Sequence, residues 1–519
     1  MARRTGASRI GVLFAVVVLT LGACSGQTAT QRPSTGSPGA STPAQTASAA
    51  ASEPAPSSDA SAEPSAEPSA EPSAEPTSDV TAAPSFEPGS GDIRWFCCLG
   101  TGEDPEAQIP VEMAAAADFS TEHPDTSMTF EVITYDAARD TLSTMIAGQN
   151  APDLVGPAGV GGIEAYHGQW LDLTPYIEAA EFDLTAYPEA LVNFYKHDDG
   201  QIGIPFAVYP SMLWYNRDLF DEAELDYPPH EYGAPYVMPD GTERPWDYDT
   251  VRELALFLTV DANGNDATSA EFDPENIVQW GFEPQRDLLA SLGAYFGAGS
   301  LEASGGAAQV PDAWRDAWKY FYDGMWTDRF IMTGPQFDDI APDAGGYAFF
   351  SGRVAMSTNF LWTTYGVGED SGVAGVWDLA AVPSHNGTTT SPLNADTFVI
   401  HESTDNPEAA FDALTYLQVD RGAELLDIYG GLPARTEEQD AFLAGQAEAF
   451  PHDVDWQVVK DSLAYPDNPN FEAFKPAYSE TDAILGTYLT RWTTTPGLDL
   501  DTEIAALEAE IQAAWDANP

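Results

Sequence analysis

The pattern of hydrophobic and polar positions divides the chain into three regions. An apolar run, 11–21, follows a start that carries Arg3, Arg4 and Arg9. Small and polar residues then dominate until Ile93, after which apolar and aromatic positions are dense. The first run is too short to span a bilayer, which needs about 20 residues. A basic start, a short apolar stretch and small residues after it are typical of a secretory signal.

The spacing of apolar positions in the third region predicts alternating strands and helices. Met128, Phe130 and Val132 alternate with polar residues, which predicts a strand. A helix is expected over 137–147 and a short buried strand over 153–155. Strand, helix and strand in this order predict an α/β fold with a parallel sheet.

Later apolar positions predict further helices. One helical face carries large side chains, and their regular spacing favours helical core over a ligand platform: Trp314, Trp318, Phe321, Tyr322 and Met325. Asn406-Pro407 predicts a helix start, and a closing amphipathic helix carries Ile504, Leu507, Ile511 and Trp515. This third region of about 430 residues is too long for one simple core, so we expect two lobes.

Composition limits the partners of the chain. It has 20 basic and 82 acidic side chains, a formal net charge of −62. Binding nucleic acid requires Lys and Arg to neutralise phosphates, so this class of function is excluded. Docking onto anionic lipid headgroups is disfavoured for the same reason. We interpret most of the carboxylates as a solvated acidic surface.

The apolar run ends at Leu21-Gly22-Ala23-Cys24, which resembles the lipobox of bacterial lipoproteins. The resemblance implies cleavage of a signal peptide, 1–23, and a lipid on the thiol of Cys24. The alternative is a plain signal peptide whose cleavage region holds a cysteine. Arg3-Arg4 alone does not distinguish the twin-arginine route from the general export route.

Residues 24–91 read as an anchored, disordered linker. Ser, Ala, Pro, Thr and Glu dominate, and Ser-Ala-Glu-Pro recurs from Ser61, Ser65, Ser69 and Ser73. Such a segment cannot bury enough apolar surface to offset its ordering entropy. Its prolines predict a semi-stiff spacer, on the order of 200 Å long at ~3.1 Å per residue when extended.

Cys97 and Cys98 are neighbours in a chain that the signal sends to an oxidising compartment. They can form a vicinal disulfide, whose tight ring distorts the peptide between them. Alternatively they are two reduced, buried thiols that pack as small apolar groups. The sequence leaves both forms open.

Five motifs in order carry a resemblance to a known family: Trp95-Phe96 with Gly100-Thr101-Gly102; Asn150 to Val155; Gly203 to Phe206 with Leu213 to Phe220; Phe349 to Met356 with Trp362; and Gly430 to Arg435. Together they resemble the family 1 extracellular solute-binding proteins, the group of the maltose-binding protein. The resemblance covers essentially all of 92–519. It implies a component that delivers sugars to an ATP-binding-cassette (ABC) importer.

The fold implied by the resemblance is two α/β lobes of the type II periplasmic-binding-protein kind, with a hinge and a ligand cleft between them. Carried onto this sequence, lobe one is 92–207 with 363–394, and lobe two is 208–362 with 395–519. The chain is expected to cross near Pro205–Pro210, return near Asn359–Trp362 and cross again near Leu393–Thr397. The long, Tyr- and Pro-rich segment 221–285 departs from smaller members.

The resemblance also implies a set of ligand-binding residues: Trp95, Asp153, Trp214, Tyr215, Trp362, Tyr365, Gly430, Gly431 and Arg435. Aromatic rings stack on the C–H faces of a sugar, while carboxylates and Arg satisfy its hydroxyls. Other roles stay open for several of them. The rings can be core, Asp153 can belong to a turn, Arg435 can form a surface ion pair, and at most one of Trp214 and Tyr215 faces the cleft.

Asp261 to Asp266 places oxygen donors at alternate positions, as a calcium loop does. The glycine is misplaced for an EF-hand and the twelfth position is Phe272, so an Asx-rich turn is favoured. The sequence shows no zinc-like Cys/His set, no Gly-x-Ser-x-Gly and no His-Glu-x-x-His. We therefore expect neither a metal, nor a cofactor, nor catalysis.

The sequence thus predicts a monomeric binding lipoprotein on the extracytoplasmic face of a membrane, anchored through Cys24. It is expected to capture a carbohydrate, most simply an oligosaccharide, and to present it to the permease. Two alternatives remain: an anchored glycoside hydrolase, which needs two facing carboxylates about 5–10 Å apart, and the same fold with a non-sugar ligand such as a glycerol phosphate or a peptide.

Overall fold

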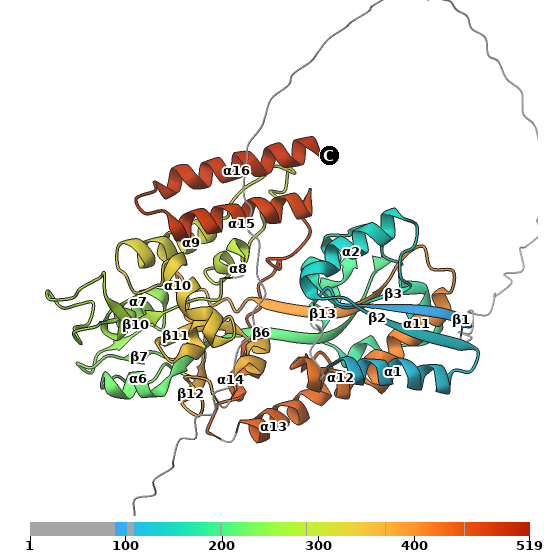
Figure 1. Cartoon of the computed structure of the whole chain (residues 1–519), viewed down its shortest axis with the longest axis horizontal. Coiled ribbons are helices and arrows are strands. Elements are labelled where there is room, and N and C mark those ends of the chain that lie inside the picture. Colours follow the sequence, from blue (N-terminus) through green and yellow to red (C-terminus); the bar gives the residue numbers. More distant parts are fainter. Residues whose placement is uncertain are drawn as a thin grey trace, which may run out of the picture. The chain divides into compact units, whose positions relative to one another are not determined.

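A computed structural model of the chain describes residues 89–100, 108–197, 200–286, 288–368, 370–450 and 452–518 (Figure 1). The predicted signal peptide, Cys24 and all but the end of the linker lie outside these ranges, as do Thr101 and Gly102. Among the helices described, none is both long and apolar enough to cross a lipid bilayer.

One sheet of ten strands runs through the folded region, in the order β2-β1-β3-β13-β6-β11-β10-β9, with β12 and β14 also paired to β6. Its strands are β1 (Gly91–Cys97), β2 (Thr126–Val132), β3 (Leu154–Gly159), β6 (Ile204–Asn216), β9 (Val260–Asp261), β10 (Ile277–Phe282), β11 (Val354–Phe360), β12 (Trp377–Ala380), β13 (Leu393–Ile400) and β14 (Leu432–Pro433). Two short hairpins stand apart: β4 (Lys196–His197) with β5 (Gly200–Gln201), and β7 (Tyr236–Val237) with β8 (Glu243–Arg244).

The strand β6 joins two lobes. Its first half, Ile204–Pro210, pairs with β13, and its second half, Ser211–Asn216, pairs with β11 and β12. All of its residues are buried. Pro205 lies where the register with β13 shifts, and Pro210 is the last residue before the partner changes. Both prolines therefore occupy positions where the ladder is interrupted, as a proline within a sheet requires.

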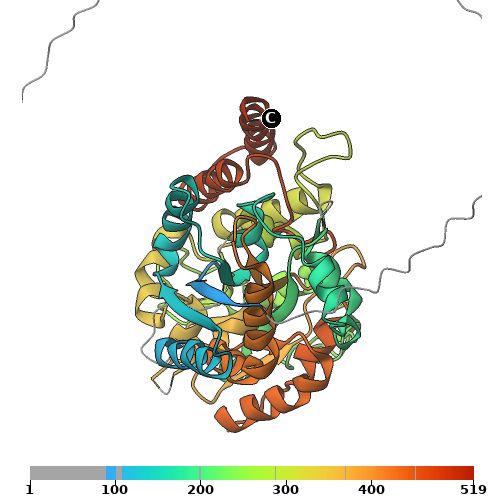
Figure 2. The same ribbon diagram turned by 90° about the vertical axis from the view of Figure 1, so that its right-hand side faces the viewer.

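Lobe one, 89–210 with 393–450, contains the parallel strands β2, β1 and β3. The predicted strand–helix–strand unit is confirmed as β2, α2 and β3. The lobe-one helices are α1 (Gln108–Glu122), α2 (Tyr135–Ala147), α3 (Val160–Glu164), α4 (Thr174–Ala179), α5 (Glu189–Phe194), α11 (Pro407–Thr415), α12 (Gly422–Tyr429) and α13 (Gln439–Ala449). Of these, α1, α2, α11 and α12 are labelled on the right of Figure 1. Figure 2 views the molecule from this side.

Lobe two, 211–392 with 452–518, contains β10 and β11 as a parallel pair. Its helices are α6 (Arg217–Glu222), α7 (Tyr248–Leu258), α8 (Leu289–Ala294), α9 (Asp312–Trp326), α10 (Gly334–Ile340), α14 (Gln457–Ser462), α15 (Tyr478–Thr494) and α16 (Leu500–Ala517). In Figure 1, α15 and the terminal helix α16 lie above α9 and α8.

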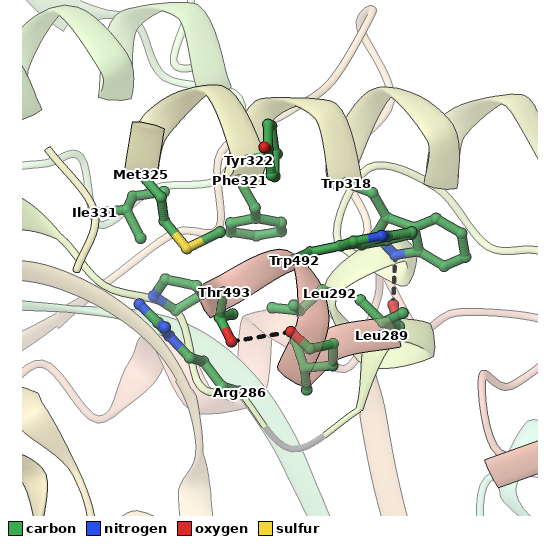
Figure 3. Close-up of a pocket in the computed structure, with 12 residues that line it drawn as sticks. Arg286, Leu289, Leu292, Trp318, Phe321, Tyr322, Met325, Ile331, Trp492 and Thr493 are labelled. Carbon is green, nitrogen blue, oxygen red and sulfur yellow. Dashed lines mark hydrogen bonds between the residues drawn. The ribbon is translucent and has the colours of Figure 1, made fainter. Parts of the chain in front are cut away.

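The aromatic stripe of α9 is core, as its spacing predicts. Its five large side chains are buried and pack against α8 and α15, where Trp318 meets Trp492 at 5.5 Å between ring centroids. The cavity that remains there, drawn in Figure 3, has a volume of about 20 Å³. That volume holds about one water molecule, so the cavity beside the stripe of α9 has no room for a sugar.

The strand pairings divide the chain differently from the sequence-based lobe boundaries. After β11 the chain stays in lobe two, because β12 pairs with Leu213–Asn216. It crosses back only at Leu393, where β13 begins to pair with β6 and β3. Residues 393–450 therefore belong to lobe one, and a third crossing falls between α13 and α14. The spacing of the motifs could not predict this boundary, because it carries no information about which strand β12 pairs with.

The Asx-rich turn at Asp261 is also observed. The Asp261 carboxylate accepts hydrogen bonds from the backbone N–H groups of Asn263 (2.8 Å), Asn265 (2.9 Å) and Asp273 (2.9 Å). These donors hold the pKa of Asp261 below its ordinary value, although burial opposes them. Both carboxylate oxygens thus serve the local fold of segment 221–285.

A buried carboxylic acid connects α1 with α12. The hydroxyl of Tyr429 donates to Glu112 Oε1 at 2.5 Å, and Glu112 Oε2 is buried without a partner among the described residues. Burial raises the pKa of Glu112 to about 7 from 4.5, opposed by the Tyr429 bond. Between these two pH values the folded protein holds more protons at this site than the unfolded chain does.

Glu112→Gln should therefore flatten part of the pH dependence of stability. In the wild type, this site makes folding less favourable as pH rises from about 4.5 to 7, by on the order of 2 kcal/mol. The amide does not titrate, so the variant should lose that slope. Urea unfolding at pH 5 and pH 7.5 measures it, with Glu122→Gln, an exposed acid of the same helix, as control. An unchanged slope in Glu112→Gln would contradict the assignment.

Candidate functional site

The carboxyl ends of the parallel strands in both lobes point at the lobe junction. In lobe one, β3 runs antiparallel to β13, so Gly159 lies opposite Asp396, near the start of β13. In lobe two, β11 runs antiparallel to β6 and ends with Phe360 opposite Ser211. Ligands of open α/β sheets bind beyond the carboxyl ends of the strands. The junction is therefore the candidate functional site.

A recess of about 160 Å³ opens at the carboxyl ends of β10 and β11. It is lined by Glu283, Pro284, Gln285, Arg286, Phe337, Gly346, Tyr347, Ala348, Phe349, Ser357 and Asn359. Amide and hydroxyl groups on its wall are held in place: Asn359 Nδ2 donates to Ser357 Oγ at 2.8 Å, and the backbone N–H of Phe360 donates to Gln285 Oε1 at 3.3 Å. Such fixed polar groups orient a ligand.

An ion pair lies in the same recess. Arg286 donates to the carboxylate of Glu283 and to the carbonyl of Met332, and the backbone N–H of Met332 donates to Glu283 at 3.0 Å. Burial raises the pKa of Glu283, and the Arg286 guanidinium opposes that shift. Arg286 Nη1 is buried and has no hydrogen-bond partner within the described ranges. The pair leaves the recess close to neutral, with one N–H donor available.

Two aromatic residues follow β11 on the short helical turn η4 (Leu361–Gly366). Trp362 is half-buried and stacks on Phe360 at 4.4 Å, with Tyr209 of β6 edge-on at 5.6 Å. Tyr365 is 70% exposed, and its hydroxyl lies 3.4 Å from that of Tyr347, which lines the recess. The rings of η4 therefore continue from the recess to the junction.

The Gly430–Gly431 loop reaches the same place from α12. A Cβ on Gly431 would lie 2.7 Å from the Tyr209 hydroxyl, so only glycine allows this approach. Gly430 ends α12 with φ of 64°, and a Cβ there would lie 3.9 Å from Thr364 Oγ1 of η4. The structure thus brings together Trp362 and the two glycines, three of the predicted residues, around Tyr209.

Lobe one contributes polar side chains from β13. Asn394 lies opposite Tyr209 and Asp396 opposite Ala207, so these side chains share one face of the sheet. A Cβ on Gly159 would lie 3.3 Å from Asp396 Oδ1, which places this carboxylate at the end of β3. Asn394 is partly exposed and Asp396 is buried, and both lie on lobe one's side of the junction.

The two lobes also touch directly along one edge of the junction. A Cβ on Gly161 of α3 would lie 2.7 Å from Glu472 Oε1 and 2.8 Å from the Tyr478 hydroxyl of lobe two. Arg139 of α2 lies 3.8 Å from Asp482 of α15. Burial raises the pKa of Glu472 to about 7. A closely packed seam of charged residues, in which Arg139 and Lys475 pair with Asp482, therefore borders the site.

Two predicted tryptophans lie in the core. Trp95 is fully buried in β1 and donates from Nε1 to the Gly156 carbonyl at 2.7 Å. Trp214 is fully buried and stacks on Trp377 at 4.7 Å between centroids. These are the core positions that the sequence left open as the alternative for both rings.

Three other predicted residues lie away from the junction. Asp153 precedes β3, at the opposite end of the strand, where it accepts from the Thr404 hydroxyl at 2.7 Å. Tyr215 is buried and donates to Asp378 at 2.8 Å. Arg435 pairs with Glu437 and Glu438 of its own turn. The turn and ion-pair roles considered for Asp153 and Arg435 describe these contacts.

Cys97 and Cys98 end β1, close to the junction. Both are buried, and their sulfur atoms lie against each other. Either redox form fits an apolar site, so the vicinal disulfide stays a prediction for a mass measurement before and after reduction.

Sequence reasoning missed most of the recess. Glu283, Gln285 and Asn359 follow or end strands whose carboxyl ends meet the junction, and Tyr209 lies at the crossover. A strand assignment for 277–282 could have found the first two, because polar residues directly after a buried parallel strand are typical of a binding site. Tyr347 depends on the folding of 341–351 and has no local signal.

Comparisons with known proteins agree with this architecture. The sequence profile of the bacterial extracellular solute-binding proteins matches residues 114–453. A lactose-binding protein of Rhizobium radiobacter is 24% identical over 402 residues, covering 72% of this chain and 84% of the relative.

Solved structures of low identity share the fold. The sugar-binding protein MalE of Xanthomonas citri aligns with a TM-score of 0.62 at 17% identity, over 82% of this chain and 98% of that one. An ABC substrate-binding protein of Listeria monocytogenes, solved with cycloalternan, aligns with a TM-score of 0.60 at 19% identity, over 82% of this chain and 98% of that one. UgpB of Mycobacterium tuberculosis, solved with glycerophosphocholine, aligns with a TM-score of 0.60 at 15% identity, over 83% of this chain and 99% of that one.

The two-lobed α/β fold predicted from the motif set is thereby confirmed, with a polar and aromatic recess at the junction of its lobes. Because the family profile matches most of the folded region, the chain belongs to the family of bacterial extracellular solute-binding proteins.

Proposed function

We propose that this protein is the substrate-binding component of an ABC importer and that it captures a carbohydrate between its lobes. The observation that carries the proposal is the recess at the ends of β10 and β11, where fixed amides and hydroxyls lie beside the rings of η4. Aromatic faces stack on the C–H faces of a sugar, and amides bond its hydroxyls. The names of the lactose-binding relative and of the MalE structure support the same class of ligand.

Capture would proceed by closure of the lobes. The recess belongs to lobe two, whereas Asn394 and Asp396 belong to lobe one, so a ligand that reaches both sets bonds to both lobes only when they are close. Ligand binding then shifts the population toward the closed state. The hinge consists of the junction in β6, the start of β13 and the segment between α13 and α14. The closed surface would be what the permease recognises.

A neutral ligand fits the site better than a phosphate ester. Arg286 is already paired with Glu283, and Asp396 adds a carboxylate on the lobe-one side. Anionic ligands require several unpaired cationic donors, and the chain holds 20 Lys and Arg against 82 acids. The similarity to UgpB extends to the fold, and the charges of this recess favour a sugar.

We also propose the anchored location that the lipobox implies. A lipid on Cys24 would hold the domain at the extracytoplasmic face, and 24–91 would let it reach both its surroundings and the permease. The proposal includes a monomeric receptor without catalytic activity.

Isothermal titration with neutral oligosaccharides, monosaccharides and glycerophosphodiesters tests the ligand class. We expect saturable binding of at least one neutral oligosaccharide and none of glycerophosphocholine, because the recess has no unpaired cation to hold its phosphate. Binding of the phosphodiester alone would overturn the sugar assignment. Release of cleavage products from a labelled oligosaccharide would instead establish the glycosidase alternative.

Trp362→Ala and Tyr365→Ala should weaken binding of the sugar found in that panel. Loss of a stacking ring at a binding site costs about 2 kcal/mol, roughly 30-fold in Kd. Titration calorimetry measures the change, and the exposed position of Tyr365 keeps the fold intact. Tyr227→Ala, an exposed tyrosine at the far end of β6, is the matched control. Equal affinity in wild type and both site variants would contradict the assignment.

Cys24→Ala should release the protein from the membrane without changing ligand affinity. The thiol is the attachment atom, and the linker separates it from the folded region by more than 60 residues. Fractionation of expressing cells, followed by calorimetry on the released protein, measures both properties. A variant that stays in the membrane fraction would show that Cys24 is not the anchor.

A further inference from the structure

Two histidines converge on one buried glutamate in lobe one. Glu164, the last residue of α3, is 5% exposed. Its Oε2 lies 3.0 Å from His167 Nδ1, and its Oε1 lies 2.9 Å from His197 Nε2 of the β4–β5 hairpin. The imidazole rings stack on each other at 4.6 Å between centroids. None of these three residues lines the recess assigned to the sugar.

The spacing of the donor atoms matches a metal site. One nitrogen of each histidine and one carboxylate oxygen all lie within 4.8 Å of one another. Zn²⁺ binds nitrogen and oxygen at about 2.0–2.2 Å in a tetrahedron, so neighbouring donors lie about 3.4 Å apart. Small rotations of His167 and His197 about their side-chain bonds would bring the three atoms to that separation.

The donor types select the metal. Two imidazoles and one carboxylate suit zinc and related first-row transition ions, whereas calcium and magnesium prefer sets of oxygen atoms. The side chain of His167 is 35% exposed, against 10% for His197 and 6% for Glu164. An ion could therefore enter past His167 and keep a water as its fourth ligand.

The surroundings favour a charged occupant. Ile163, Trp170 and Tyr195 belong to one apolar cluster of lobe one, and Ile163 directly precedes Glu164 in α3. A buried carboxylate is costly unless it is paired, and here its hydrogen-bond partners in the described chain are the two imidazoles. A divalent ion between the three groups would neutralise the carboxylate fully.

The cluster also lies at the edge of the lobe junction. Phe474 of lobe two covers the ring of His167 at 4.2 Å between centroids. Gly161, on the same short helix as Glu164, is in contact distance of Glu472. A group that fixes the ring of His167 would therefore also fix the surface on which Phe474 rests.

We infer that Glu164, His167 and His197 form a binding site for a divalent transition ion of the zinc class. The site is separate from the sugar recess and does not depend on the function proposed above. Sequence reasoning could not find it, because Glu164 and His167 lie one helical turn apart while His197 comes from a hairpin 33 positions after Glu164. The sequence therefore lacks the close Cys/His spacing of known zinc motifs.

Metal titration of the full-length protein, purified in detergent and stripped with a chelator, tests the site. With Mg²⁺ in excess to occupy surface carboxylates, Zn²⁺ should bind with a stoichiometry of one and raise the Tm. Co²⁺ should bind at the same site and give visible absorption bands. His167→Gln and His197→Gln should each weaken Zn²⁺ binding by at least about 10-fold and remove the Co²⁺ bands.

The matched control is His385→Gln. His385 also contacts a carboxylate, Asp316 at 3.2 Å, but its stacking partner is Phe296. This variant should bind Zn²⁺ as the wild type does, and circular dichroism should show the same fold for all three variants. The inference is overturned if no saturable binding of one ion occurs, or if either His167→Gln or His197→Gln binds as tightly as the wild type.

Discussion

The folded region depends on the backbone ladder of one strand, β6. Its thirteen residues are all buried, and its two halves serve different lobes. β13 and β14 pair with the first half, and β11 and β12 pair with the second. β13 runs antiparallel both to β6 and to β3, so β3 ends at the junction. β11 runs antiparallel to β6 and parallel to β10, so β11 and β10 end at the same junction from the other lobe. Loss of the β6 ladder would separate the two lobes and so the residues that each of them contributes to the candidate site.

This arrangement explains why the site consists of segments far apart in the sequence. The recess takes residues from the ends of β10 and β11 and from 341–351, and the junction adds Tyr209, η4 and the Gly430–Gly431 loop. In the closure proposed above, these segments would move toward one another at the hinge. Proline at the crossover contributes, since Pro210 offers no N–H to a strand and the ladder changes partner there.

Buried carboxylates are the second constraint on this acidic chain. Glu112, Glu164 and Glu283 lie inside a protein with few cations, so each is stabilised by local means. Glu283 has Arg286, Glu112 has the Tyr429 hydroxyl and a raised pKa, and Glu164 has two imidazoles. In a protein with a formal net charge of −62, each of these buried carboxyl groups depends on a local partner or on a raised pKa, because desolvation makes an unpaired anion costly.

Local patterns determined the strand–helix–strand unit of lobe one, the aromatic core of α9, the closing helix α16 and the Asx turn at Asp261. Each depends on contacts within a few residues or on the periodicity of one element. The order of motifs indicated the family. Three of the residues that the resemblance implied, Trp362, Gly430 and Gly431, lie at the junction, and their part in ligand binding stays a prediction. The tertiary structure alone decided the lobe boundaries, the core positions of Trp95 and Trp214, and the grouping of Glu164 with His197. These depend on which strands pair and on which ends meet, and long-range pairing leaves no periodic trace in the chain.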